Sequence, residues 1–557
     1  AGRRLGGSVG EMVVIALVGA ATHGLMAGAG SPRGSDPALQ PAAGDPLPGL
    51  TPEQRDRFMT GRVMFDLNIG VADGLGPIFN QTSCASCHNN PVGGSGTQSV
   101  TRFGASTKNG FDDLADFGGS LLQAQSIDPE CAETIPPEAT ITTLRVTPGA
   151  LGYGLIEAIP DADLLALEQN PPPGVSGRAN LVIPLESPDE PRVGRFGWKA
   201  QIATILTFSA DAAQMELGLT NRLLPDENDP NGIRPPDLGP CDNVADPEDG
   251  PHLGDGMDYI DRVTDFQRYL APPPQTPRSG MMGESLFAQI GCTACHTPSF
   301  VTADDPGLEA VLRNRTIRPY SDFLLHDMGL NADFIEQDGA GAREMRTTPL
   351  WGLRRRDPMW HDGRFAGGSF EERARAAIEA HGSFGSEGNT SADAWAALSP
   401  SDQALVLQFL DSLGRREFDL TGDDEVDLDD FPLFRDCYLS DDTYTPDDLC
   451  AIADLDQHTD VDLTDLDFFL EAFDDPLEDC NANGHPDLRD ILVGDSADAD
   501  GDFIPDECQG CPADIDGGDG LVGASDLLLL LANWDTNGPG AALAPPTTLV
   551  TIDDLIT

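Results

Sequence analysis

Two short motifs combine the residue types that attach haem to a protein. Both are CxxCH sequences, one at residues 84–88 (Cys84, Cys87, His88) and one at residues 292–296 (Cys292, Cys295, His296). In this spacing two thiols can add to the two vinyl groups of one haem, and the adjacent histidine can bind its iron. A redox-active CxxC pair or half of a zinc site is the other interpretation of a single motif. Two complete copies favour two covalent c-type haems, haem 1 at His88 and haem 2 at His296.

The elements that must position these motifs follow the same order twice. A helical pattern over residues 257–270 stops at three prolines, and one over 399–413 has a capped start and ends at Gly414. A short helix is expected at 285–290, just before the second motif. The repeated order of helix, CxxCH, long loops and terminal helix indicates an internal duplication of a cytochrome-like unit.

The net charge of −60 is distributed unevenly along the chain. Residues 415–557 hold 39 of the 93 acidic residues but four of the 33 basic ones, a net charge of −35. A chain with this charge repels phosphate backbones, so nucleic-acid binding is excluded as a function class. An acidic segment with interspersed hydrophobic residues needs counter-ions to become compact, and Ca²⁺ is the obvious candidate.

The acidic tail repeats the ligand spacing of a Ca²⁺-binding loop, with oxygens at alternate positions and a carboxylate at position 12. The first two loops have aspartate at position 12, as in the dockerin loops that they resemble, but no glycine at position 6. The next two loops resemble thrombospondin type 3 repeats, and the last resembles half of a dockerin pair. The predicted calcium ligands, loop by loop, are Asp419, Thr421, Asp423, Glu425, Asp427 and Asp430; Asp454, Asp456, His458, Asp460, Asp462 and Asp465; Asp479, Asn481, Asn483, Asp487 and Asp490; Asp498, Asp500, Asp502 and Asp506; and Asp514, Asp516, Asp519 and Asp526.

The N-terminus and the cysteines indicate an exported protein. Arg3 and Arg4 precede an apolar run at residues 12–20, a pattern typical of a signal peptide that would act as a membrane anchor if retained. Seven cysteines lie outside the CxxCH motifs and are expected to form disulfides, with one left over. Cys437 and Cys450 bracket the link between the first two calcium loops and could staple it. We expect a periplasmic or extracellular location.

Five sequence blocks resemble the di-haem oxidoreductase family, which is related to bacterial di-haem cytochrome c peroxidases. The blocks occur in the family's order over about residues 51–414, and their coincidence makes the resemblance specific. They are GLGPIFN at 74–80, GRFGWKA at 194–200, YSDFLLHDMG at 320–329, RTTPLWGL at 346–353 and HDGR at 361–364.

The ligands on the second side of each iron decide the chemistry. An iron with two protein ligands carries electrons, whereas an iron with an open side can bind peroxide or oxygen. After His88 the next histidine is His252, so haem 1 has no obvious second histidine, and Met215 is a possible thioether ligand. The resemblance implies an acid over the peroxide-binding haem, and Glu216 stands at the matching position.

The resemblance also implies three roles near haem 2. The residue at the end of the helix after the HDGR block is the distal haem 2 ligand in related enzymes, and here it is His381. Met328 and His326 are reserve candidates, while His361 is expected to bond a propionate or a backbone group. Related enzymes place an aromatic residue between the haems, and Trp198 matches it, although a core tryptophan is equally compatible.

These features predict an exported oxidoreductase that reduces a peroxide at haem 1. Electrons would enter at haem 2 from a redox partner protein, and Glu216 would act as acid and base. The alternatives are a non-enzymatic di-haem electron carrier and a di-haem oxygenase acting on an organic substrate. The dockerin-like loops also raise the possibility of a cell-surface or scaffold partner for the tail.

The predicted fold is mainly α, with two cytochrome c-like haem domains, long loops, and an EF-hand-like or dockerin-like calcium tail. The expected segments are a signal peptide or anchor at 1–30, a linker at 31–50, an N-terminal haem domain at 51–275, a C-terminal haem domain at 276–414, paired dockerin-like loops at 415–475, thrombospondin type 3-like repeats at 476–510, and a dockerin-like half repeat with the C-terminal residues at 511–557.

Overall fold

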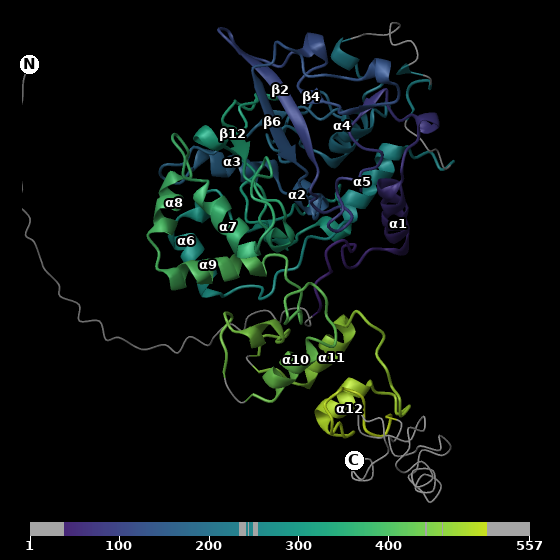
Figure 1. Ribbon diagram of the computed structural model, residues 1–557, viewed down its shortest axis with the longest axis vertical. Coiled ribbons are helices and arrows are strands. Elements are labelled where there is room, and N and C mark those ends of the chain that lie inside the picture. Colours follow the sequence, from purple (N-terminus) through teal and green to yellow (C-terminus); the bar gives the residue numbers. More distant parts are fainter. Residues whose placement is uncertain are drawn as a thin grey trace, which may run out of the picture. The chain divides into compact units, whose positions relative to one another are not determined.

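The computed structural model describes residues 38–232, 241–242, 244–248, 254–440, 443–458 and 460–509 (Figure 1). The predicted signal segment lies outside these residues, as do the last four predicted calcium ligands, Asp514, Asp516, Asp519 and Asp526. Within the described ranges, no helix combines the length and the apolar character that a membrane span requires.

The helices begin at the capping residues that the sequence provides. Thr51 and Gln54 form a capping box at the first helix, and Ser399 accepts a hydrogen bond from the backbone of Asp402 at the ninth. The helices predicted at 257–270, 285–290 and 399–413 are confirmed as α5, α6 and α9. The α-helices are α1 (Pro52–Asp66), α2 (Tyr153–Glu157), α3 (Asp161–Gln169), α4 (Ile205–Leu217), α5 (Tyr259–Tyr269), α6 (Met282–Gln289), α7 (Phe370–Glu379), α8 (Asn389–Ala396), α9 (Pro400–Ser412), α10 (Phe431–Tyr438), α11 (Leu463–Ala472) and α12 (Asp487–Val493).

The expectation of a mainly α fold is wrong, because α-helices hold fewer than a third of the described residues and strands recur between them. The stretches between the helices, expected as long loops, contain β1 (Ile78–Phe79), β2 (Ser99–Thr107), β3 (Gly110–Asp112), β4 (Leu121–Leu122), β5 (Gln125–Ser126), β6 (Ile141–Val146), β7 (Leu181–Val182), β8 (Arg192–Val193), β9 (Phe300–Val301), β10 (Thr316–Ile317), β11 (Leu325–Asp327) and β12 (Glu344–Arg346).

The largest sheet explains why the expectation failed. In it β2 pairs antiparallel with β6, from Ser99 opposite Val146 to Gly104 opposite Ile141, and β3 and β4 extend the same sheet (Figure 1). Both long strands are rich in valine, isoleucine and threonine, whose branched side chains favour extended backbone. These strand-forming residues were present in the sequence, but the fold was predicted from the helical patterns around the CxxCH motifs. The fold is therefore mixed.

The two helix pairs next to the CxxCH motifs repeat one packing arrangement. α1 packs against α5, where a Cβ on Gly61 would lie 2.3 Å from the carbonyl oxygen of Arg262. α6 packs against α9, where a Cβ on Gly283 would lie 2.0 Å from the carbonyl oxygen of Leu405. Four residues after each glycine comes a phenylalanine, Phe65 or Phe287, which packs against a phenylalanine of the facing helix. The predicted duplication is thus visible in the packing.

Three hydrophobic cores hold the described chain together. The first surrounds α1 and α5 and also takes Phe300, Phe323 and Trp351 from beyond residue 275. The second lies between α6 and α9 and includes Trp395. The third belongs to the acidic tail and is built from side chains of the loops, α10 and α11.

The glycines at the two helix crossings give a first testable prediction. Gly61→Ala and Gly283→Ala should each lower stability by about 1–3 kcal/mol, because the added methyl group meets a backbone carbonyl that cannot move aside. Gly307→Ala is the matched control, since its added Cβ would meet a side-chain oxygen of Asp305 at 3.2 Å. Thermal unfolding followed by circular dichroism measures all three. A control that unfolds as early as the crossing variants would contradict this packing argument.

Candidate haem sites

Both CxxCH motifs adopt the same turn. The backbone N–H of His88 donates to the carbonyl of Cys84 at 3.0 Å, and that of His296 donates to the carbonyl of Cys292 at 2.9 Å. The ring of Phe65 lies 5.9 Å from that of His88, and the ring of Phe287 lies 6.1 Å from that of His296. One architecture therefore positions both motif histidines beside the helix pair that precedes and follows them.

Each motif histidine is held in the tautomer that binds a metal through Nε2. Nδ1 of His88 donates to the carbonyl of Gly94 at 3.1 Å, and Nδ1 of His296 donates to that of Tyr320 at 2.9 Å. Burial lowers the pKa of each imidazole to about 4, so both rings are neutral. A neutral ring whose Nδ1–H is bonded to a carbonyl offers its Nε2 lone pair to iron.

The motif cysteines are neutral thiols. They are the free cysteines of the described chain, and burial raises the pKa to about 11 for Cys84 and about 12 for Cys87 and Cys292. Burial also raises the pKa of Cys295. A redox-active CxxC needs a stabilised thiolate, which this environment disfavours. The motif cysteines therefore fit thioether attachment of haem better than a redox-active pair.

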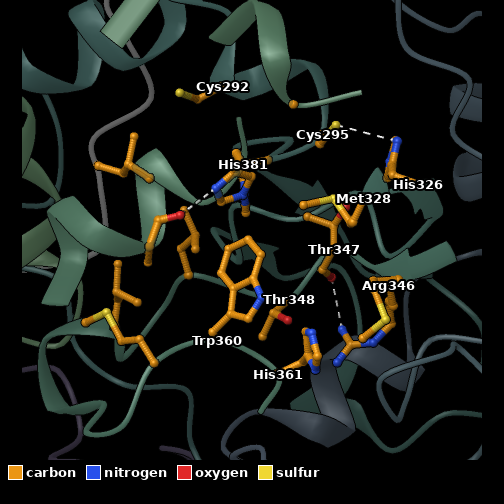
Figure 2. Close-up of a pocket in the computed structure, with 18 of the residues that line it drawn as sticks. Cys292, Cys295, His326, Met328, Arg346, Thr347, Thr348, Trp360, His361 and His381 are labelled. Atoms are coloured by element: carbon orange, nitrogen blue, oxygen red, sulfur yellow. Dashed lines mark hydrogen bonds between the residues drawn. The ribbon is translucent and has the colours of Figure 1, made fainter. Parts of the chain in front are cut away.

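A large apolar cavity lies against the second motif. Its lining includes Cys292, Cys295, His296, Met328, Trp360 and His381. Figure 2 shows how Cys292, Cys295, Met328, Trp360 and His381 are arranged around it. The wall is mainly apolar, with a few polar groups such as Arg346 and Thr347. A flat hydrophobic cofactor with polar edges needs a wall of this kind.

The geometry of two imidazoles in this cavity fits one iron. The ring centres of His296 and His381 lie 6.4 Å apart. Nδ1 of His381 donates to the carbonyl of Ala377 at 2.8 Å, and burial lowers the pKa of His381, so its Nε2 also carries a lone pair. Two imidazoles with nitrogens about 2 Å from a shared metal have ring centres about 6 Å apart. The residues present therefore fit a haem with axial ligands His296 and His381.

The reserve candidate His326 is engaged elsewhere. Its Nε2 lies 2.9 Å from Asp322 and its Nδ1 lies 2.9 Å from Glu387, with the sulfur of Cys295 at 3.6 Å. Burial alone would lower its pKa, but the hydrogen bonds to Asp322, Cys295 and Glu387 raise the pKa of His326 to about 12. A protonated ring with both nitrogens bonded to carboxylates has no lone pair for iron. Met328, the other reserve candidate, lines the cavity.

Trp198 and His361 also line this cavity. The Trp198 indole donates to the carbonyl of Val146 at 2.9 Å, and its ring lies 6.3 Å from that of His361. Nε2 of His361 donates to the carbonyl of Asn331 at 2.9 Å, which confirms the expected bond to a backbone group. Nδ1 of His361 is buried without a hydrogen-bond partner among the described residues.

The surroundings of His88 differ from those of His296. In the described part of the chain no second imidazole packs against His88. Glu216, at the end of α4, accepts a hydrogen bond from Nδ2 of Asn80 at 2.8 Å, and burial raises its pKa. Its charge contributes to the raised pKa of Cys87, which places Glu216 near the first motif. Met215 is close to Gln123, whose Nε2 lies 4.0 Å from the Met215 sulfur.

The first two acidic loops share one hydrogen-bonding pattern. At position 12 of each loop a buried aspartate, Asp430 or Asp465, accepts from the backbone N–H groups of loop positions 2 and 9. Asp454, Asp456 and Asp465 have ligand atoms within 4.8 Å of one another. Asp419 is fully buried, and its Oδ2 has no hydrogen-bond partner among the described residues, although Nη2 of Arg354 lies 3.8 Å away. The intervening predicted ligands of both loops are mostly exposed, namely Thr421, Asp423, Glu425, Asp427, His458, Asp460 and Asp462.

The next two loops close on themselves in a similar way. Asp490 is buried and accepts from Asn481 and Asn483 through Oδ2, while its Oδ1 has no hydrogen-bond partner in the described part of the chain. Asp479 accepts from the backbone of Asn483, and Asp487 from that of Cys480. The last described loop brings Asp498, Asp500 and Asp502 within 4.8 Å, and Asp506 accepts from the backbone of Ala499.

Three disulfides are formed in the described chain. Cys437–Cys450 is the staple that the sequence predicted between the first two loops, and Cys480–Cys508 spans the next two. Cys131–Cys241 is the third. The remaining cysteine, Cys511, lies outside the described residues.

The first acidic loop is bonded to the haem 2 side of the chain. Asp424, at loop position 6, lies 3.3 Å from Nε of Arg354 and 3.2 Å from Nη1 of Arg355. Its φ of +76° is the left-handed conformation that this position requires. The departure from glycine thus has a structural reason, because the aspartate side chain fastens the loop to its neighbour.

The sequence did not single out several residues that the structure brings to these sites. Asp322 and Glu387 hold His326, although the spacing of four residues between Asp322 and His326 was a readable signal. Trp360, next to His361 in the chain, packs edge-on against His381 with ring centres 5.1 Å apart. Arg102 is part of β2, and its positive charge partly counteracts the raised pKa of Glu216. Only the fold brings these two charges near each other.

Comparison with known proteins supports the family indicated by the sequence blocks. Residues 138–413 match the family model described as "Di-haem oxidoreductase, putative peroxidase". The match includes the second CxxCH motif and begins after the first. No curated protein sequence matches the chain.

One similar solved structure is described as "Crystal structure of a MauG-like protein associated with microbial copper homeostasis". It shares 14% identity with this chain at a TM-score of 0.31, over 68% of this chain and 94% of that one. The family model is the comparison that carries weight, and a di-haem family implies two haems. Residues 138–413 are thus similar to the di-haem oxidoreductases, and the His296–His381 pair within this segment fits a haem.

Proposed function

We propose that the protein reduces a peroxide at haem 1 with electrons delivered through haem 2. The observation that carries this proposal is the asymmetry between the motifs: His296 has His381 opposite it at 6.4 Å, whereas His88 has no second imidazole against it in the described chain. Haem iron supplies the electron and peroxide chemistry when bound, and an open axial side is what peroxide needs. The four motif cysteines attach the two haems covalently.

Glu216 supplies the proton transfer that the reaction needs. Reduction of a peroxide to water takes up protons as well as electrons, so a group beside the reacting oxygens must move protons. Burial raises the pKa of Glu216, which lets its carboxyl group hold a proton nearer to neutral pH. Asn80 fixes the carboxylate by donating to Oε2, so the group is oriented before the substrate arrives.

The remaining features favour an activity outside the cytoplasm. We infer that the chain is exported to the periplasm or beyond, that the tail loops bind Ca²⁺, and that a redox protein donates electrons at haem 2. Disulfides persist in oxidising compartments, which supports export. Asp419 and Asp490 each have a buried oxygen without a hydrogen-bond partner among the described residues, which supports Ca²⁺ binding because a divalent cation would satisfy it.

The Glu216 role is testable by one substitution. Glu216→Gln should lower peroxide turnover about a hundredfold, since the amide keeps the hydrogen-bonding shape but cannot carry the proton. Electronic and spin-resonance spectra should remain those of the wild type, with one high-spin and one low-spin iron. Steady-state peroxide consumption with a reduced electron donor is the measurement.

Glu138→Gln, at an exposed position, is the matched control and should retain full turnover. Unchanged turnover in Glu216→Gln would remove this carboxylate from the mechanism. Two low-spin irons that persist after reduction would favour the electron carrier, and turnover with O₂ in the absence of peroxide would favour the oxygenase.

A further inference from the structure

Four rings form a row that starts at the proposed haem 2 ligand. Trp360 packs edge-on against His381 with ring centres 5.1 Å apart, and the next ring along, His361, lies 6.2 Å from Trp360. His361 in turn lies 6.3 Å from Trp198. Figure 2 shows Trp360 between His381 and His361 on the cavity wall. Each ring is in contact with the next at the separations of packed aromatic pairs.

Backbone carbonyls fix the orientation of the three rings beyond His381. The carbonyl oxygen of Asn331 accepts from Nε1 of Trp360 at 3.3 Å and from Nε2 of His361 at 2.9 Å, so one acceptor ties two rings together. The carbonyl oxygen of Val146 accepts from Nε1 of Trp198, and the backbone N–H of Val146 donates to the carbonyl of His361 at 2.8 Å. The row is therefore held rigidly.

The far end of the row reaches the first motif. Val146 is followed by a segment that lies beside the residues after the first motif. The backbone N–H of Thr147 donates to the carbonyl of Gln98 at 3.0 Å, and that of Ala150 donates to the carbonyl of Gly93 at 2.8 Å. Ser95, close to the first motif in the chain, lines the same cavity as Trp198 and His381. The row thus runs from the proposed haem 2 ligand to the segment beside the first motif.

We propose that Trp360 and His361 extend the link from Trp198 to the haem 2 ligand, so that electrons cross from haem 2 to haem 1 along His381, Trp360, His361 and Trp198. This inference rests on the proposed function, which supplies the donor and the acceptor. In each passage haem 2 loses one electron and haem 1 gains one, while the four rings end unchanged. The ring N–H groups of Trp360, His361 and Trp198 all point at carbonyls, which are too weakly basic to take their protons, so the electron moves without a proton.

The test uses the full-length haem-loaded protein and a laser-flash photoreductant that places one electron on haem 2. Trp360→Leu should slow the passage to haem 1 about tenfold, a rise of ~1.4 kcal/mol in the activation free energy. His361→Leu should have a similar effect, because it removes the ring between Trp360 and Trp198. Among the described residues His361 forms no ring pair with His381, so this variant leaves the packing of the haem 2 ligand unchanged. Trp395→Phe is the control, because Trp395 is a buried tryptophan of the core between α6 and α9 that lies outside the row.

Two further measurements distinguish loss of the electron path from a change in structure and from failure of the proposed function. The low-spin signal of haem 2 and the thermal unfolding midpoint should match the control in His361→Leu, so a slower passage there reports the row. Wild-type passage rates in both His361→Leu and Trp360→Leu would overturn the inference, as would slowing in Trp395→Phe alone. Failure of the wild type to consume peroxide would contradict the proposed function while leaving the flash measurement interpretable.

Discussion

Replacing Cys84 and Cys87 by serine is expected to remove one of two covalent haems and to abolish peroxide reduction. Serine cannot form the thioether bonds, and the single histidine His88 would then hold the cofactor without a second protein ligand among the described residues. The variant should carry one covalent haem per chain instead of two. A pyridine haemochrome assay, compared with the protein mass, measures this number. The high-spin signal should disappear from the spin-resonance spectrum, and the low-spin signal should remain.

The reciprocal variant is the control for this prediction. Replacing Cys292 and Cys295 by serine should remove the low-spin signal and leave the high-spin one, because His296 and His381 then lose their shared cofactor. One haem should again remain. A wild-type protein with one covalent haem or none would contradict the two-haem assignment, and loss of the same signal in both variants would contradict the assignment of spin states.

Local patterns in the sequence predicted the parts of the fold that depend on local interactions. The helical patterns predicted α5, α6 and α9, and the two CxxCH motifs identified in the sequence adopt the same turn. The pairing of β2 with β6 was missed because the two strands are about forty residues apart in sequence, although β3 follows β2 directly in the chain. Long-range pairing is the information that a local pattern lacks.

The same limit applies to the candidate sites. His381 was named because it ends a helix that follows a recognisable block, and the structure brings it opposite His296. Trp360 and the carboxylates around His326 were not named, since their roles depend on contacts between distant segments. Asp424 stood out in the sequence only because it replaces glycine at loop position 6. The two arginines that it binds, Arg354 and Arg355, are brought next to it only by the fold.

The second large effect is expected in the acidic tail, which should be compact at neutral pH only when Ca²⁺ is bound. Residues 415–557 carry a net charge of −35, and folding brings their carboxylates together. Ca²⁺ that binds the folded loops stabilises them by mass action. Chelation at pH 7.5 should therefore expose the chain after Gly414 to proteolysis and reduce its circular dichroism, while the haem absorption stays constant. A tail that is equally protease-resistant in excess chelator would contradict the calcium assignment.

The pH dependence without Ca²⁺ should have the opposite sign to that of the Ca²⁺-bound tail. Burial, with the nearby charges of Asp456 and Asp454, raises the pKa of Asp465 to about 6, above its value of about 3.9 in an unfolded chain. Between these values the folded tail binds more protons than the unfolded tail, so its stability falls as pH rises. The chelated tail should consequently resist proteolysis better at pH 5 than at pH 7.5. With Ca²⁺ the order should reverse, because protons compete with the cation for the same carboxylates.

Asp465→Asn separates the two effects in a single residue. The amide carries no charge, so the chelated variant should lose part of its pH dependence and the second loop should lose its Ca²⁺, which equilibrium dialysis measures as fewer ions per chain. Asp429→Asn, an exposed aspartate outside the ligand positions, should change neither property. A chelated Asp465→Asn tail with the full pH dependence of the wild type would show that other carboxylates set it. Burial and the nearby charges of Asp456 and Asp454 oppose the negative charge of Asp465, although the backbone N–H groups of Leu455 and Asp462 donate to its carboxylate. A proton or a cation on this carboxylate should therefore stabilise the folded loop.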